Sequence, residues 1–174
     1  MGEDIEEVSA LALARAGDSA GARTIAAALS KHSPTDLLLN NYWLPSIRAA
    51  IDINQKDPAA AIEALEITRP YEAGGDPITL DTLYPVYLRG QAYLMQRRGS
   101  EAVAEFQKIL DNRGRVANGA LGALAHLQLG KAYALSSETL KARTAYQDFL
   151  ALWKNADPEI PLLRQAAAEY SRLH

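Results

Sequence analysis

The stretch Tyr84–Ile109, YPVYLRGQAYLMQRRGSEAVAEFQKI, decides the fold because its spacing recurs in Leu124–Phe149, LAHLQLGKAYALSSETLKARTAYQDF. In each stretch a glycine is followed after three residues by a tyrosine, after twelve by an alanine and after sixteen by an aromatic residue. These markers are Gly90, Tyr93, Ala102 and Phe106 in the first stretch, and Gly130, Tyr133, Ala142 and Tyr146 in the second. Such a recurrence is typical of a two-helix repeat whose helices interlock through small and aromatic residues.

The first eighty residues carry fainter copies of the same spacing. Two pairs of alanines are again twelve residues apart: Ala10 with Ala22, and Ala49 with Ala61. The small residues that lead the successive copies are 39, 41 and 40 residues apart. In the second copy Asp52 occupies the place of the tyrosine. We therefore expect four helical hairpins, with the register of the first two less well defined by the sequence.

The composition favours an all-α fold. Of the 174 residues, 48% are hydrophobic and 22% charged, close to the average for globular proteins. Alanine runs at 26–28, 59–61 and 166–168 favour closely packed helices. We predict one domain over residues 1–174, with hairpins over 3–33, 35–70, 80–112 and 119–154. A final amphipathic helix over 159–173 is expected to cover the last hairpin as a cap.

Charge and composition exclude several function classes. The absence of cysteine rules out disulfides and thiolate metal sites. A net charge of −3 disfavours binding to nucleic acid. No apolar run approaches the roughly 18 residues of a membrane span, and the acidic opening at residues 3–7 lacks the basic start of a signal peptide. We expect a soluble chain, with the cytoplasm as its favoured compartment and no membrane contact.

No catalytic, cofactor or metal site is expected from the sequence. His126 stands where a repeat of this kind carries a packing residue, so we interpret it as structural. Two glycine-rich segments, 74–75 and 114–119, lack the lysine and hydroxyl of a phosphate loop and are interpreted as turns. A site built around His126, Tyr133 and nearby carboxylates is the alternative in which the chain is an enzyme.

Two arginines break the pattern. Arg48 and Arg89 directly precede a leading small residue, where the fourth copy has Leu129. Either these helices are longer and rotated, or the arginines pair with carboxylates of neighbouring helices, because a buried guanidinium needs an acidic partner.

The third and fourth hairpins resemble tetratricopeptide repeats. The segments LYPVYLRGQAYL, EFQKILDNRG, GALAHLQLGKAYA and AYQDFLALWKNADPEIPLLRQAAAEY are similar to the C-terminal repeat region of bacterial eukaryotic-like serine/threonine protein kinases and related multidomain signalling proteins. The resemblance implies a right-handed superhelix that serves as the interaction arm of a larger protein. The sequence then represents an excised C-terminal fragment. It contains no HRD or DFG motif, so it has no kinase activity of its own.

The resemblance also implies a binding surface. In such superhelices the first helix of each hairpin lines a concave groove. Projected onto this sequence, the lining comprises Trp43, Ser46, Tyr84, Tyr87, Gln91, Met95, Leu127 and Lys131. We expect this groove to bind a peptide or a segment of a partner protein. Two alternatives stay open: the aromatic residues pack between hairpins instead, or the array mainly self-associates into a homo-oligomer.

Overall fold

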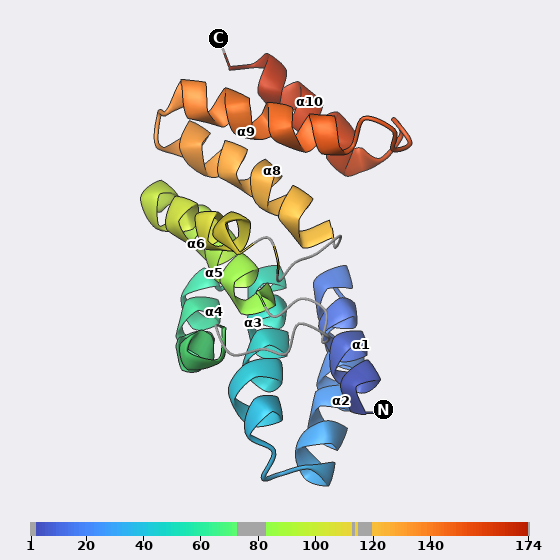
Figure 1. Ribbon diagram of the computed structural model, residues 1–174. Coiled ribbons are helices and arrows are strands. Elements are labelled where there is room, and N and C mark those ends of the chain that lie inside the picture. Colours follow the sequence, from blue (N-terminus) through green and yellow to red (C-terminus); the bar gives the residue numbers. More distant parts are fainter. Residues whose placement is uncertain (1–2, 73–82, 113, 115–119, 174) are drawn as a thin grey trace. The chain divides into compact units, whose positions relative to one another are not determined.

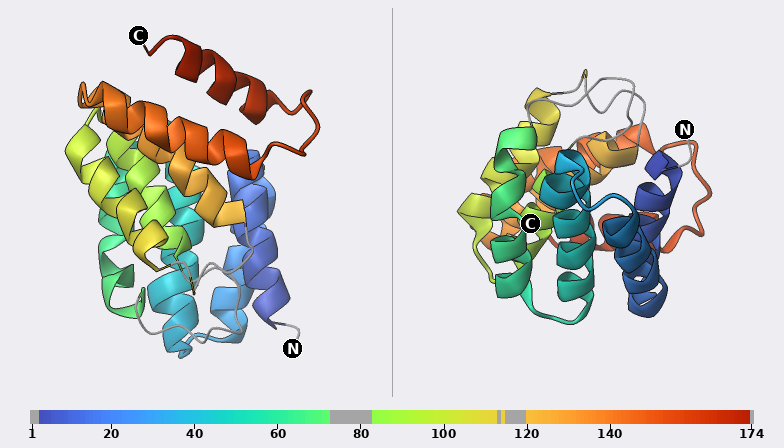
Figure 2. Two further views of the ribbon diagram at one scale, coloured as in Figure 1. Left: turned by 45° about the horizontal axis from the view of Figure 1, so that its top comes forward. Right: turned by 90° about the horizontal axis from the view of Figure 1, so that it is seen from below.

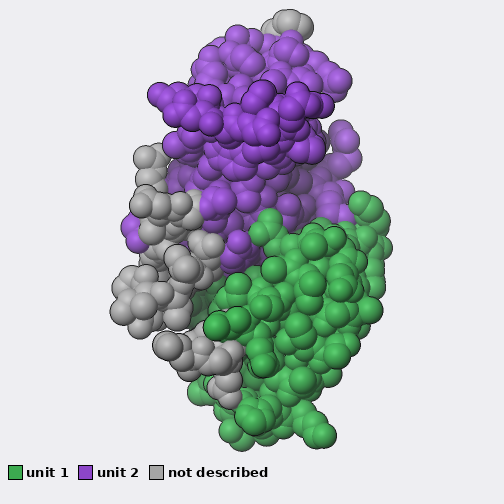
Figure 3. Space-filling model, turned by 90° about the vertical axis from the view of Figure 1, so that its right-hand side faces the viewer, with its two compact units in different colours: residues 1–76 green, residues 77–174 purple. Residues whose placement is uncertain are grey.

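The computed structural model describes residues 3–72, 83–112, 114 and 120–173, and over these residues the chain is helical without strands. The predicted all-α class is confirmed. The chain divides into two compact units, residues 1–76 and 77–174 (Figure 3). The division falls within the expected linker between the second and third hairpins. The single domain over residues 1–174 stays a prediction.

Unit 1 contains two hairpins. The first consists of α1 (Glu3–Ala16) and α2 (Ser19–His32), which pack along each other (Figure 1). The second begins with a π-helical turn, η1 (Leu39–Trp43), that continues into α3 (Leu44–Asn54). It returns through α4 (Pro58–Ala64) and a 3-10 segment, η2 (Glu66–Tyr71). The first helices of the two hairpins, α1 and α3, also pack against each other.

Unit 2 contains two further hairpins and a final helix, which can be followed by colour in Figure 2. The hairpins are α5 (Tyr84–Met95) with α6 (Gly99–Asp111), and α8 (Ala120–Leu135) with α9 (Thr139–Leu152). Helix α8 packs against both α5 and α6. The final helix, α10 (Pro161–Ser171), lies along α9. Each unit is therefore built by stacking one hairpin on another.

The same backbone turn joins the two helices of every hairpin. Seven residues after each leading small residue stands a residue with positive φ: Gly17 (94°), Lys56 (64°), Arg97 (59°) and Ser137 (61°). Its N–H binds the carbonyl three residues earlier, at 3.0 to 3.1 Å. The next N–H binds the carbonyl five residues earlier, at 2.9 to 3.0 Å. This pair of bonds ends a helix through a residue in the left-handed conformation. It recurs in all four hairpins, so the repeat seen in the sequence is also a repeat of the backbone.

The second helix of each hairpin also starts in the same way. The alanine twelve positions after the leading small residue donates its N–H to the carbonyl of the residue that precedes the helix. These alanines are Ala22, Ala61, Ala102 and Ala142, and all four are fully buried. In unit 1 the start is reinforced by Asp18 and Asp57, whose carboxylates accept N–H bonds from Gly21 and Ala60. A fixed turn therefore brings each of these alanines to the same place.

Close helix contacts follow from this register. A Cβ added to Gly90 would lie 2.6 Å from the Phe106 ring, and one added to Gly130 would lie 2.7 Å from the Tyr146 ring. Glycine is thus the residue that allows an aromatic ring sixteen positions later to lie on the facing backbone. In the first two hairpins the leading residue is a buried alanine, and the position sixteen later holds a smaller side chain, Ala26 or Leu65.

We predict that glycine at the turns stabilises the protein. Lys56→Gly and Ser137→Gly should each raise the free energy of unfolding by about 1 kcal/mol, because glycine adopts positive φ without steric cost. Urea unfolding followed by circular dichroism measures this. Ala104→Gly, at an exposed site inside α6, is the control and should lower the free energy by a similar amount. Destabilisation by all three changes would contradict the turn assignment.

We also predict coupling between Gly90 and Phe106. Gly90→Ala should cost about 1–3 kcal/mol, because the added methyl group would overlap the ring. In a Phe106→Leu background the same change should cost clearly less. A double-mutant cycle of unfolding free energies tests this. Additive effects would show that the ring is not what excludes a side chain at position 90.

Candidate functional site

A cleft of about 400 Å³ lies between α2 and α3 in unit 1. Its wall on α2 is formed by Arg23, Ala26 and Ala27. The wall on α3 is formed by Leu44, Ile47, Arg48, Ile51 and Asp52. Positions three, four, seven and eight apart share one face of a helix, so these side chains project together. The short side chains on α2 leave space that the larger side chains of the facing helix do not fill.

The chain leading into α3 contains a π-helical turn and a proline. The chain is helical without a break from residue 37 to residue 54, and Pro45, which cannot donate a backbone bond, follows the π-helical turn Leu39–Trp43 within this stretch. The regular α-helix begins at Leu44. A π-turn takes in more residues than a regular turn and so changes the angular phase between the residues before it and those after it.

The electrostatic character of the cleft comes from three charged side chains. Two are the guanidinium groups of Arg23 and Arg48, both on exposed residues. The third is the carboxylate of Asp52, whose side chain is 15% exposed. Its Oδ2 atom lies 3.8 Å from Arg48 Nε and, within the described part of the chain, accepts no hydrogen bond. The cleft thus combines an apolar floor, an excess of positive charge and a buried acceptor.

The pKa of Asp52 reflects this environment. Burial raises the pKa of the carboxyl group above its ordinary value, and the positive charge of Arg48 opposes that shift without cancelling it. The charged form is therefore poorly solvated at neutral pH.

Four of the eight residues expected to line a groove are buried in the structure: Trp43, Ser46, Tyr87 and Leu127. Trp43 makes an edge contact with the Tyr42 ring, and Ser46 donates to the Tyr42 carbonyl. Tyr87 contacts Phe106 and accepts a hydrogen bond of 3.2 Å from Gln128. These side chains pack inside the units and do not line an open surface. The alternative in which the aromatic residues pack between hairpins is supported for Tyr87, which binds Gln128 of the next hairpin, and stays a prediction for Trp43.

The other four groove residues keep some contact with solvent: Tyr84, Gln91, Met95 and Lys131. Met95 is 37% exposed, and Lys131 Nζ lies 3.9 Å from a carboxylate oxygen of Glu169. A role for these residues in binding stays a prediction. None of them lines the cleft in unit 1.

The projection missed the cleft in unit 1 by one residue. It selected Trp43 and Ser46, whereas the cleft is lined by Leu44 and Ile47. Ser46 shares the packed face of Ala49, three residues later, and Ile47 is buried as well, at the floor of the cleft. No pattern in the sequence distinguishes the cleft, because Ile47 and Ile51 are buried and also serve as core.

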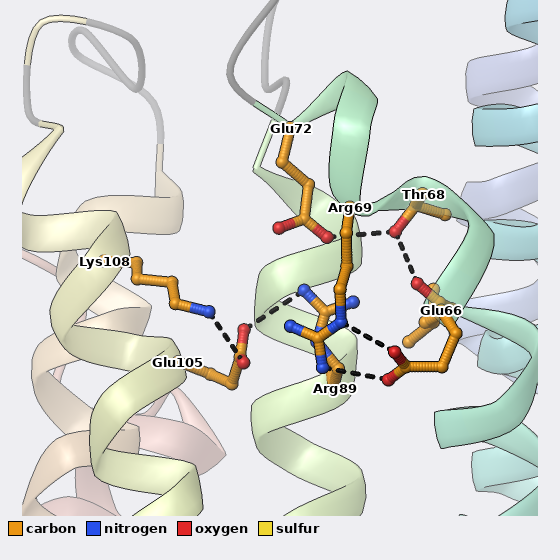
Figure 4. A network of polar contacts seen from close by, with 8 residues as sticks. Glu66, Thr68, Arg69, Glu72, Arg89, Glu105 and Lys108 are labelled. Carbon is orange, nitrogen blue, oxygen red and sulfur yellow. Dashed lines mark hydrogen bonds and ion pairs between the residues drawn. The ribbon is translucent and has the colours of Figure 1, made fainter.

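The two unusual arginines have different environments. Arg48 is exposed and pairs within its own helix with Asp52. Arg89 of α5 is fully buried, and its Nη2 lies 3.2 Å from Oε2 of Glu105 on α6, whose other oxygen accepts a 2.9 Å bond from Lys108 (Figure 4). Pairing with a neighbouring helix is therefore correct for Arg89 alone. The attraction within a buried pair of this kind is largely offset by the cost of removing both charges from water.

Figure 4 also shows the polar contacts of η2 in unit 1. Arg69 donates two hydrogen bonds to the Glu66 carboxylate, at 2.8 and 2.9 Å. Thr68 is buried and donates to the Leu65 carbonyl, and its hydroxyl lies 3.0 Å from a Glu72 carboxylate oxygen. These local bonds hold the 3-10 segment together across Pro70, which cannot donate a backbone bond.

The residues considered for catalysis make structural contacts. His126 is partly buried on α8, and its Nδ1 lies 3.5 Å from Asp148 of α9. The ring of Tyr133 lies beneath the ammonium group of Lys141, at 5.4 Å. Within the described residues, no three side chains gather as metal ligands, and no helix is long and apolar enough to cross a membrane. The expectation that the chain is not an enzyme stays a prediction.

Comparison with protein-family models, with curated proteins and with solved structures finds no match to this chain.

We predict that Asp52 weakens the fold at neutral pH. The pKa of Asp52 is raised in the folded state, so folding favours the protonated carboxyl group. The folded protein is therefore more stable at low pH, and this stability is lost as the pH rises through the pKa of the folded state. Asp52→Asn should therefore raise the free energy of unfolding at pH 7. The difference from wild type should shrink below about pH 4, the ordinary pKa of an aspartate. Unfolding in urea between pH 3 and 8 measures this, and a difference independent of pH would contradict it.

Proposed function

We propose that the chain is a tetratricopeptide-like interaction module without catalytic activity, and that it binds a peptide segment of a partner protein in the cleft between α2 and α3. The observation that carries the proposal is the cleft itself, with its apolar floor, its two arginines and the unsatisfied Asp52 oxygen. Concave sites with an apolar lining and a few polar groups are where ligands bind in proteins generally.

The repeat architecture supports the proposal. Four hairpins share one turn geometry and one spacing of small residues, and first helices stack within each unit, α1 on α3 and α5 on α8. Arrays of helical hairpins commonly use their stacked surfaces to bind other proteins. By its likeness to the repeat arms of signalling kinases, the module would serve to recruit a partner to an attached domain.

The chemistry of the cleft indicates the kind of peptide. Small and branched apolar side chains on Ala26, Ala27 and Ile47 suit an aliphatic side chain. The guanidinium groups of Arg23 and Arg48 suit a neighbouring carboxylate, which each can bind through two parallel hydrogen bonds. The preferred ligand is therefore a segment in which an acidic residue adjoins an aliphatic one.

A peptide-display selection on the immobilised full chain tests the proposal. We expect enrichment of sequences that pair an acidic with an aliphatic residue, and at least about tenfold weaker binding of the enriched peptides to the Arg23→Ala, Arg48→Ala double variant. The double variant Arg97→Ala, Arg172→Ala removes the same charge from exposed sites outside the cleft and should bind normally. Failure to enrich any peptide would refute the proposed function.

A second pair of variants tests the location. Ala27→Trp places a large ring in the cleft and should abolish binding while all its charges remain. Ala28→Trp, at an exposed site on the same helix but outside the lining, should leave binding unchanged. Equal binding by the two variants would show that the peptide binds elsewhere on the chain.

A further inference from the structure

Helix α10 lies on a surface formed by α8 and α9, within unit 2. One side of α10 carries Ala166, which is fully buried, together with the partly buried Leu162, Leu163 and Tyr170. The surface beneath it consists of Leu127 and Ala123 from α8, and of Tyr146, Phe149 and Leu150 from α9, with Trp153 just after that helix. We call this surface the α8–α9 face. It contacts a whole amphipathic helix.

Polar contacts fix how α10 lies on the α8–α9 face. Tyr146 donates a 2.9 Å hydrogen bond to Glu169, and Gln147 donates a 2.7 Å bond to the Tyr170 hydroxyl. The guanidinium of Arg143 lies 5.1 Å from the centre of the Tyr170 ring and also donates to the Leu173 carbonyl. Burial, together with the bond to Glu169, raises the pKa of Tyr146, so its phenol stays a donor. Direction and register are thus specified by side chains.

The contact residues of α10 follow a helical pattern. Leu162, Ala166 and Glu169, together with Leu173 just after the helix, are spaced at intervals of four, three and four residues. This is the spacing by which an amphipathic helix places successive side chains into a groove of a partner protein. The α8–α9 face therefore has the form of a helix-binding site, and α10 supplies its ligand from the same chain.

Little besides this face holds α10 in place. The helix has 11 residues, too few to be stable alone in water. The connection from α9 is largely exposed, and its backbone bonds are local, such as Ala156 N–H to Trp153 and Ile160 N–H to Asp157. Segments of this kind open at a lower free energy than the core does.

We propose that the α8–α9 face binds α10 of a second copy of this chain, so that two copies exchange their final helices. The exchanged contacts are the same as the internal ones, which makes helix exchange a low-cost route to a dimer. The proposal does not depend on the cleft in unit 1. It assigns self-association of the chain to the α8–α9 face.

The exchange has a quantitative consequence. A free α10 peptide competes with the internal helix, so its apparent dissociation constant equals the effective concentration of that helix, about 1 mM for a short flexible connection. When two chains exchange α10, each exchanged helix makes the same contacts as the internal helix does. The free energy of these contacts is therefore the same in the monomer and in the dimer. The dimer should therefore form in the same concentration range, whatever the strength of each contact.

A fluorescent peptide of residues 158–173, titrated with the full chain, tests the binding site by anisotropy. The chain variant Glu169→Ala weakens only the internal competitor and should bind the peptide about tenfold more tightly than wild type. The chain variant Tyr146→Phe weakens the internal helix and the peptide equally, so its apparent affinity for the peptide should not change.

Two variants of the peptide test the contact itself. A peptide with Ala166→Arg should not bind, whereas Ala167→Arg, at an exposed position, should leave binding intact. Equal affinities in the wild-type titration and in all four variant titrations would overturn the site.

Sedimentation equilibrium tests the second copy. Wild type and Glu169→Ala should dimerise with the same dissociation constant, near the value for the wild-type peptide titration. If the peptide binds as described but the full chain stays monomeric at and above that concentration, the face accepts a helix without exchange between copies, and the proposal is overturned.

Discussion

The structure depends on the close approach of the two helices in each hairpin. Where the leading residue is Gly90 or Gly130, an aromatic ring from the returning helix lies directly on its backbone. The turn makes this possible, because a left-handed residue seven positions later reverses the chain in the same way each time. The contact requires a fixed register between the two helices, and the turn supplies that register.

The cleft follows from a variation on that contact. At the position equivalent to Phe106 and Tyr146, the first hairpin has only Ala26, and the next residue is also alanine. Side chains this small cannot fill the space beside α3, so the cleft remains between them. The alanine that stands in place of an aromatic residue makes the repeat pattern fainter in unit 1. It also leaves room for a ligand.

The two surfaces considered for binding differ in what fixes their specificity. The cleft presents exposed guanidinium groups over a small apolar floor, which suits an extended segment with a carboxylate. The α8–α9 face presents aromatic and aliphatic side chains with hydrogen-bonding groups at their edges, which suits a helix. Sequence separates these poorly, since both surfaces include alanine and leucine residues of kinds that also form the core.

By itself the sequence determined the helical class, the number of hairpins, the spacing of their small residues and a final amphipathic helix, because these are set by local periodicity and by punctuation at glycine and proline. Only the tertiary structure decided which face of each helix is open. Ser46, Tyr87 and Leu127 each lie three residues before a leading small residue, and all three are buried, because that position shares the packed face of its helix. The environment of Arg89 was likewise decided by tertiary structure, because a carboxylate sixteen residues away becomes its partner only when α6 folds back on α5.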